Sequence, residues 1–158
     1  MKDQSEGQNM VEIRLARIVI REGTDQQWIF LTERNGQRGF PIIIGNHEAA
    51  EIQRVVTREQ PRRPLTHQLA YSLVESLGAT IVRVDIVDLR ENTFFAQVVL
   101  HQPMHDVTAV IDARPSDALA LALRAGCPLR VAESVLEQAR TDQSGPDPIG
   151  PSPQPDQP

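Results

Sequence analysis

The sequence is poor in cysteine and in aromatic residues, and each scarcity limits what the chain can be. A single cysteine excludes an internal disulfide and a cysteine-rich zinc site. Aromatic residues make up 4% of the chain, which leaves too few rings for an extended base-stacking platform. We therefore expect a core of Val, Ile, Leu and Ala, and we place four aromatic residues in it: Trp28, Tyr71, Phe94 and Phe95.

Long apolar runs are also absent. No stretch approaches the length that spans a membrane, and residues 1–9 are polar without the apolar run of a signal peptide. These features predict a cytoplasmic protein that does not associate with membranes.

Charge is unevenly distributed along the chain. The net charge is −5, of which residues 141–158 carry −3 and residues 1–9 carry −1. The nearly neutral remainder draws all its positive charge from arginine, which suits bidentate contact with phosphate or carboxylate. This balance permits a nucleic-acid partner without requiring one.

Hydrophobic periodicity and turn residues divide the middle of the chain into strands and helices. The phase of the first strand shifts near Arg17, which indicates a β-bulge. We expect strands at 12–20, 28–32, 40–44, 80–89, 93–101, 107–112 and 128–131, and helices at 45–58, 64–77, 115–124 and 133–139.

The two halves of this pattern match each other at a spacing of 69 residues. Arg14 and Arg21 correspond to Arg83 and Arg90, and Glu48-Ala49 corresponds to Asp117-Ala118. Two strands with the same period match at apolar positions by chance, but matches at charged positions arise less readily in this way. The predicted fold class is therefore α+β, with internally duplicated β-β-β-α units, a connecting helix, and a mostly antiparallel sheet packed with helices.

The duplication also defines the expected domain organisation. The repeats cover about residues 12–58 and 81–127, within one domain at 10–140. We expect residues 1–9 to be disordered, and the proline-rich tail at 141–158 as well.

The strand-to-helix turn at 111–118 holds more charge than a helix start needs. Pro115 suits the first helical position, and Asp117 follows in the first turn with Asp112 and Arg114 beside it. Glu48 occupies the equivalent turn of the first half. If the halves pack about a pseudo-twofold axis, these acids share one cleft.

Grouped carboxylates are ligands for hard divalent cations, so we expect Glu48, Asp112 and Asp117 to bind Mg²⁺ or Mn²⁺. The alternative is that Glu48 and Asp117 are helix-start acids and that Asp112 pairs with Arg114. His67 lies in the segment between the halves, and we expect it to act as a general base or a metal ligand. The alternative is a helix-start residue that is hydrogen-bonded to the backbone.

A local basic cluster follows the first predicted helix, and with Arg114 it forms the expected nucleic-acid-binding set. Such a set holds the phosphate backbone without reading sequence. The alternative is a solvated helix face with ion pairs. The set is Arg54, Arg58, Arg62, Arg63 and Arg114.

Four segments occur in order and at close spacing: Pro41-Ile42-Ile43-Ile44-Gly45 with Glu48-Ala49, Arg63-Pro64-Leu65-Thr66-His67, Arg83-Val84 with Asp88-Leu89, and Ile111-Asp112-Ala113-Arg114-Pro115-Ser116-Asp117-Ala118. Together they resemble the bifunctional nuclease family, small domains credited with cleaving both DNA and RNA. The resemblance covers residues 11–139 and implies a duplicated α+β fold. One departure stands out, because the family reads Thr-His-Asp where this chain has Gln68 after His67.

The resemblance implies a homodimeric hydrolase that cleaves phosphodiester bonds in DNA and RNA with little sequence preference. The expected catalytic residues are His67, Glu48 and Asp117, assisted by a divalent metal. A non-catalytic binding or regulatory module that retains the fold is the alternative. An enzyme that acts on a small phosphorylated molecule is a third possibility.

Overall fold

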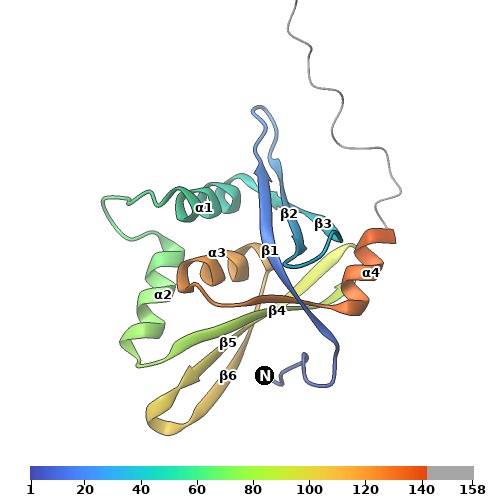
Figure 1. The fold of residues 1–158 in the computed structure, drawn as a ribbon. Helices are drawn as coiled ribbons and strands as arrows, with labels where there is room; N and C mark the ends of the chain where they lie inside the picture. Colours follow the sequence, from blue (N-terminus) through green and yellow to red (C-terminus); the bar gives the residue numbers. More distant parts are fainter. Residues whose placement is uncertain (142–158) are drawn as a thin grey trace, which may run out of the picture.

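One seven-stranded sheet organises residues 1–141, the part of the chain that the computed structural model describes (Figure 1). The strand order is β3-β2-β1-β7-β4-β5-β6, and among these strands only the β4–β7 pair is parallel. This arrangement confirms an α+β fold with a mostly antiparallel sheet. The strands are β1 (Met10–Val19), β2 (Gln26–Glu33), β3 (Gly39–Gly45), β4 (Thr80–Arg90), β5 (Thr93–Gln102), β6 (Val107–Ala113) and β7 (Leu129–Ala132).

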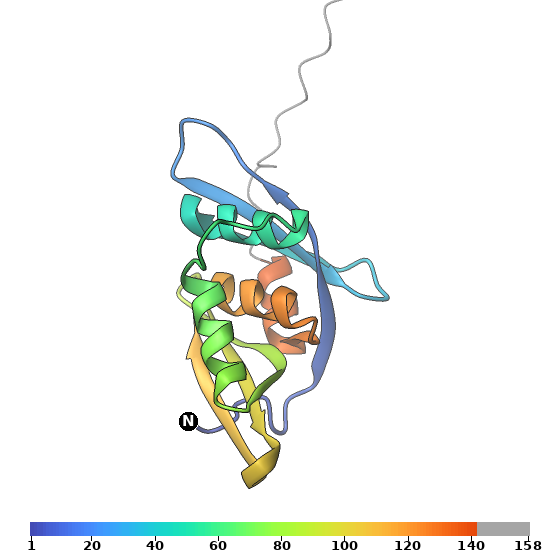
Figure 2. The same cartoon turned by 90° about the vertical axis from the view of Figure 1, so that its left-hand side faces the viewer.

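Each half of the sheet continues into a helix, and these two helices pack against each other (Figures 1 and 2). The helix of the second half, α3 (Pro115–Ala125), has Pro115 at its first position and is followed by Gly126, whose φ of 66° is left-handed. The connecting helix packs on α3, as Figure 2 shows. The helices are α1 (Asn46–Thr57), α2 (Thr66–Ser76), α3 (Pro115–Ala125) and α4 (Glu133–Thr141), with a 3₁₀ turn η1 at Pro103–His105. None of the described helices is long and apolar enough to cross a membrane.

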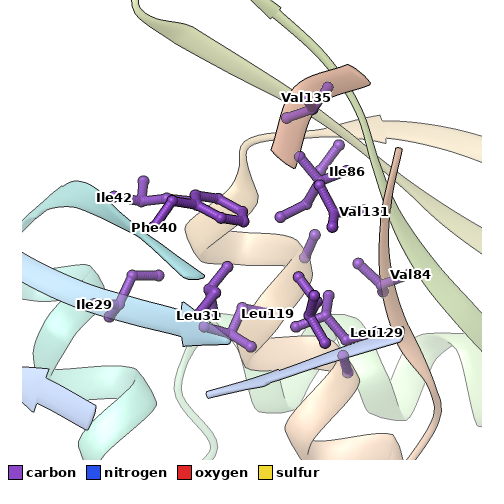
Figure 3. Packing of buried hydrophobic residues seen from close by; sticks show 14 of the residues in the cluster. Ile29, Leu31, Phe40, Ile42, Val84, Ile86, Leu119, Leu129, Val131 and Val135 are labelled. Atoms are coloured by element: carbon purple, nitrogen blue, oxygen red, sulfur yellow. The ribbon is translucent and has the colours of Figure 1, made fainter. Parts of the chain in front are cut away.

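The core lies between the two halves of the sheet, around α3 (Figure 3). Ile29 and Leu31 of β2 face Leu119 of α3, and all three are buried almost completely. Ala118, Ala120 and Ala122 are also buried in α3, and their small side chains let the helix lie close to the strands. Phe40 stacks on Phe94 with ring centroids 5.4 Å apart, which joins β3 to β5.

The 69-residue correspondence extends to part of the strand pairing. Trp28 pairs with Ile43 in the first half, and the residues 69 positions later, Gln97 and Asp112, pair with each other in the second. The first hairpins do not correspond in this way: residues 20–25 separate β1 from β2, whereas two residues separate β4 from β5. The internal duplication therefore stays a prediction, with agreement in the second hairpin and in the helix that follows it.

The β-bulge predicted near Arg17 is present. The β1–β2 register shifts between Leu15 and Arg17, so Ala16 is the extra residue. The shift keeps Ile18 against the core while Arg17 lies opposite Phe30 on the other face of the sheet. One inserted residue thus reconciles an apolar inner face with a basic outer face.

The N-terminal segment differs from the expectation that residues 1–9 are disordered. The backbone N–H of Gln4 donates to Gln97 Oε1 at 3.0 Å, and Gln97 Nε2 donates to the Lys2 carbonyl at 3.2 Å. Asp3 forms an ion pair with Arg83, and Ser5 is buried. The physical reason is the buried Gln97 amide, which needs hydrogen-bond partners that the polar segment supplies. The predicted tail at 141–158 lies outside the described residues except for its first position.

The connecting helix forms as predicted, but its leucines face outward. Tyr71 and Val74 pack inward against the core. Four leucines at four-residue spacing instead form an exposed stripe along α2, which we call the leucine stripe: Leu65, Leu69, Leu73 and Leu77, with exposures from 37% to 71%.

Candidate functional site

Two carboxylates occupy equivalent places at the starts of α1 and α3. Glu48 is the third residue of α1, and Asp117 is the third residue of α3. Gly45 precedes α1 in extended conformation, and a Cβ there would lie 2.4 Å from Glu48 Oε2. Glycine at this position therefore leaves room for the Glu48 carboxylate to fold back over the helix start, where the N–H groups and helix dipole favour negative charge.

Arg114 joins the two helix starts. Its Nε and Nη2 donate to Asp117 Oδ2 and Oδ1 at 2.8 and 3.1 Å, and its Nη1 lies 2.9 Å from Glu48 Oε1. Planar guanidinium donors suit such a bidentate contact. The Arg114 side chain is 64% exposed, so it bridges the carboxylates from the solvent side. The predicted alternative pairing of Asp112 with Arg114 is replaced by this bridge between the two halves.

His67, the second residue of α2, completes the group. Its Nε2 lies 2.8 Å from Asp117 Oδ1. An ionised carboxylate only accepts hydrogen bonds, so the proton of neutral His67 lies on Nε2 and Nδ1 is left as the basic nitrogen. Glu48, Asp117, Arg114 and His67 thus form one cluster, which we call the charged turn.

Both carboxylates of the charged turn are held ionised. Burial of Asp117 by itself raises its pKa, but hydrogen bonds from Arg114 and His67 outweigh burial and the pKa lies below its usual value. The pKa of Glu48 is also lowered, chiefly by a hydrogen bond from its own backbone N–H, against burial and with help from Arg114. Asp117 therefore serves as an acceptor that orients His67 near neutral pH.

Asp112 is not part of the charged turn. It is exposed on β6 and pairs in register with Gln97, so both side chains lie on the sheet face that the N-terminal segment covers. Ala113, the next residue, packs against the core on the other face. Within residues 1–141 no three His, Cys, Asp or Glu side chains are grouped to hold a metal ion.

The other arginines of the predicted binding set also lie apart from the charged turn. Arg54 donates to Glu51 at 3.1 Å within α1, and Arg58 is the residue at which α1 ends. Arg62 and Arg63 are exposed in the segment between α1 and α2. Only Arg114 of the five binds the two carboxylates.

Gln68 stabilises its own helix. Its Oε1 accepts the backbone N–H of Leu65 at 3.1 Å, which satisfies a donor at the start of α2. This hydrogen bond directs Gln68 toward the helix end and leaves the contact with Asp117 to His67.

A cleft of about 660 Å³ adjoins the charged turn. Its lining includes the charged side chains of Glu48 and Arg114 and the apolar side chains of Trp28, Ile43 and Phe94. Trp28 was expected in the core but is half-buried on the face opposite Ile29 and Leu31. The alternation along 28–31 could have placed it there, because neighbouring residues in a strand point to opposite faces.

Comparison with known proteins identifies relatives over most of the chain. The family model for the bifunctional nuclease domain matches residues 29–144. An "uncharacterized protein" of Mycobacterium tuberculosis is 42% identical over 130 residues, 82% of this chain and 76% of the relative. "Bifunctional nuclease 1" of Arabidopsis thaliana is 28% identical over 93 residues, 58% of this chain and 29% of the plant protein. "Bifunctional nuclease 2" of the same plant is 27% identical over 93 residues.

Proposed function

Because the chain belongs to the bifunctional nuclease domain family, we propose that it hydrolyses phosphodiester bonds in DNA and RNA with little sequence preference. The observation that carries this proposal is the charged turn, where an exposed arginine that lines a cleft also bonds to the carboxylate of a His–Asp pair. A phosphate-binding cation beside an oriented imidazole is a minimal arrangement for phosphodiester hydrolysis.

Arg114 binds the scissile phosphate in this proposal. Its guanidinium is exposed and its donors match two phosphate oxygens as well as they match a carboxylate. An incoming phosphate therefore competes with Glu48 and Asp117 for Arg114. The exposed arginines Arg58, Arg62 and Arg63, with the half-buried Arg54 beside them, hold flanking phosphates and fix the position of the strand without reading its bases.

His67 accepts the proton of the attacking water at Nδ1. The water oxygen forms a bond to phosphorus, the bond from phosphorus to the leaving sugar oxygen breaks, and that oxygen takes up a proton from a solvent water. The His67 imidazolium then releases its proton to solvent, which restores the neutral base. Asp117 accepts the Nε2 hydrogen bond and stabilises the imidazolium that forms. The charged turn thus supplies the base and the carboxylate that orients it.

A divalent metal remains part of the proposal, with a smaller ligand set than the sequence indicated. Mg²⁺ often binds through one or two carboxylates and completes its coordination shell with waters and substrate phosphate. The carboxylate oxygens of Glu48 and Asp117 are ligands of this type. Such an ion would supply positive charge to the phosphate oxygens. Asp112 lies on the other face of the sheet and is not a member of this set.

The test is cleavage of labelled single-stranded RNA and DNA by the purified protein with Mg²⁺, Mn²⁺ or EDTA. Asp117→Asn keeps the side-chain shape but weakens the contacts with His67 and Arg114, whereas Asp112→Asn removes an equivalent charge away from the charged turn. We expect Asp117→Asn to lose at least about 100-fold in rate and Asp112→Asn to cleave like the parent protein. Equal rates for all three proteins would refute the assignment of the site.

A non-catalytic nucleic-acid-binding module is the second candidate. It is favoured by the bridging position of Arg114, which occupies both carboxylates that a metal would need, and by Gln68, which caps α2. Binding of the same oligonucleotides without cleavage under any metal condition would establish it. If the cleft beside the charged turn bound a mononucleotide but no oligonucleotide, the substrate would instead be a small phosphorylated molecule.

We further propose a cytoplasmic homodimer formed through the leucine stripe of α2. The stripe carries no charge, and Arg62 and Arg63 precede the helix. Antiparallel packing against a second copy places the arginines that precede each helix beside the negative C-terminal end of the other. Charge complementarity therefore favours a second copy of this chain as the occupant.

A further inference from the structure

The outer face of β1 and β2 pairs arginines with aromatic rings. The guanidinium carbon of Arg17 lies 4.1 Å from the centre of the Phe30 ring, and that of Arg21 lies 5.3 Å from the centre of the Trp28 ring. Arg14 is exposed on β1 opposite Thr32, which belongs to the same face as Phe30. A row of arginines thus runs beside a row of aromatic side chains.

The helices leave this face accessible. Ile29 and Leu31 point toward Leu119 of α3 (Figure 3), so Trp28 and Phe30, which alternate with them along β2, point away from the core. Both rings are half-buried, while Arg17 and Arg21 are exposed above them. We call this surface, formed by Arg14, Arg17, Arg21, Trp28, Phe30, Pro41 and Ile43, the outer face.

The outer face is continuous with the cleft at the charged turn. Trp28 pairs with Ile43 and Phe30 pairs with Pro41, and Ile43 is 57% exposed. Trp28, Pro41 and Ile43 line the same cleft as Glu48 and Arg114. A chain lying along the outer face can therefore cross strand β3 and reach Arg114.

We propose that the outer face binds single-stranded nucleic acid and leads it to the charged turn, an extension that rests on the proposed function for the site it reaches. Bases stack on the guanidinium planes of Arg17 and Arg21, because a guanidinium that covers the ring of Phe30 or Trp28 still presents its other plane. Phosphates lie against the arginines of β1, which gives the charge complementarity that selects a polyanion. Single strands are required because paired bases keep their faces stacked inside a duplex.

Trp28 is the only tryptophan of the sequence, so its fluorescence reports binding at the outer face. The experiment titrates the full chain with a 12-nucleotide oligo-dT in EDTA, so that binding is measured apart from metal-dependent cleavage. Comparison titrations use an abasic oligomer of equal charge and a blunt duplex. We expect quenching of Trp28 by oligo-dT, with weaker binding and little quenching by either comparison.

Two variants locate the contact. Phe30→Leu keeps Trp28 as the reporter, and we expect it to weaken oligo-dT binding by about 5- to 100-fold. Phe95→Leu is the matched control, because Arg90 lies 4.0 Å above the Phe95 ring in the other half of the sheet. Arg17→Gln keeps the ring and removes the charge, so it should weaken binding and lower its dependence on salt.

The outcomes separate this proposal from the nuclease proposal. Loss of binding in Phe30→Leu and Arg17→Gln, but not in Phe95→Leu, supports the outer face whether or not the protein cleaves the oligonucleotide. Unchanged binding in both outer-face variants overturns it, even where the parent protein proves to be a nuclease. Equal weakening by Phe95→Leu also overturns it, since stacking would then not be confined to this face.

Discussion

Replacement of Asp85 tests how much the buried ionic network on β4 stabilises the fold. The carboxylate is 0% exposed, and it accepts hydrogen bonds from Arg130 Nε at 2.6 Å, Arg130 Nη2 at 2.8 Å and Arg83 Nε at 2.9 Å. Asp85→Asn preserves the shape and removes the negative charge. Arg130 then faces an amide and has no carboxylate partner, whereas Arg83 keeps only its ion pair with Asp3.

The magnitude follows from the burial of the two arginines. Leaving a fully buried charge unpaired costs about 3–5 kcal/mol. The side chains of Arg83 and Arg130 are 28% and 29% exposed, so water compensates part of the lost interaction with the carboxylate. We therefore expect Asp85→Asn to lower the free energy of unfolding by about 2–4 kcal/mol.

Urea denaturation followed by circular dichroism measures this change as a shift in midpoint at constant slope. Asp88→Asn is the matched control on the same strand, because the Asp88–Arg90 pair is 41% and 61% exposed. An exposed pair of this kind contributes about 0–1 kcal/mol. If both variants lose less than about 1 kcal/mol, the reasoning from burial is refuted.

Three further predictions concern the charged turn and α2. The Asp117 pKa is lowered in the folded state, so this carboxylate stabilises the fold above its unfolded pKa of about 3.9 and the contribution is lost as the pH falls through the folded value. The difference in unfolding free energy between the parent and Asp117→Asn should thus be larger at pH 7 than at pH 3, and a pH-independent difference would contradict it. Gln68→Ala should cost about 0.5–1.5 kcal/mol in urea denaturation through loss of the hydrogen bond to Leu65, with Gln68→Glu, which retains an acceptor, losing less. Leu69→Lys should convert a dimer to a monomer in size-exclusion chromatography with light scattering, and a monomeric parent protein would rule out the leucine stripe as its interface.

Local sequence signals were sufficient for the elements and for the starts of the two central helices. Glu48 and Asp117 were placed in equivalent first turns, because Gly45 and Pro115 mark helix starts in the sequence itself. The Arg17 bulge was also predicted, since a bulge changes the phase of a strand within a few residues.

Contacts between the halves could not be predicted in the same way. The bridge from Arg114 to Glu48 depends on how α1 and α3 pack, and no spacing along the chain encodes that distance. Asp112 was grouped with the other acids although strand alternation turns it to the opposite face from Ala113.

The leucines of α2 and the N-terminal segment show a second limit. A four-residue period predicts a helix face whether that face is buried or exposed, so the leucine stripe was consistent with either. Residues 1–9 are polar, and composition alone predicts no structure for them. Their order depends on two residues that are distant in sequence: Gln97, whose amide hydrogen-bonds to this segment, and Arg83, which forms an ion pair with Asp3.

The position of β7 has a consequence for how the protein is synthesised. This strand lies between β1 and β4, yet its residues, Leu129–Ala132, leave the ribosome after every other strand. Until then β1 and β4 each present an open edge, and such edges pair readily with other chains. A nascent or truncated chain that ends before residue 129 holds two unjoined three-stranded sheets, which makes aggregation its main hazard and late sheet closure the step that removes it.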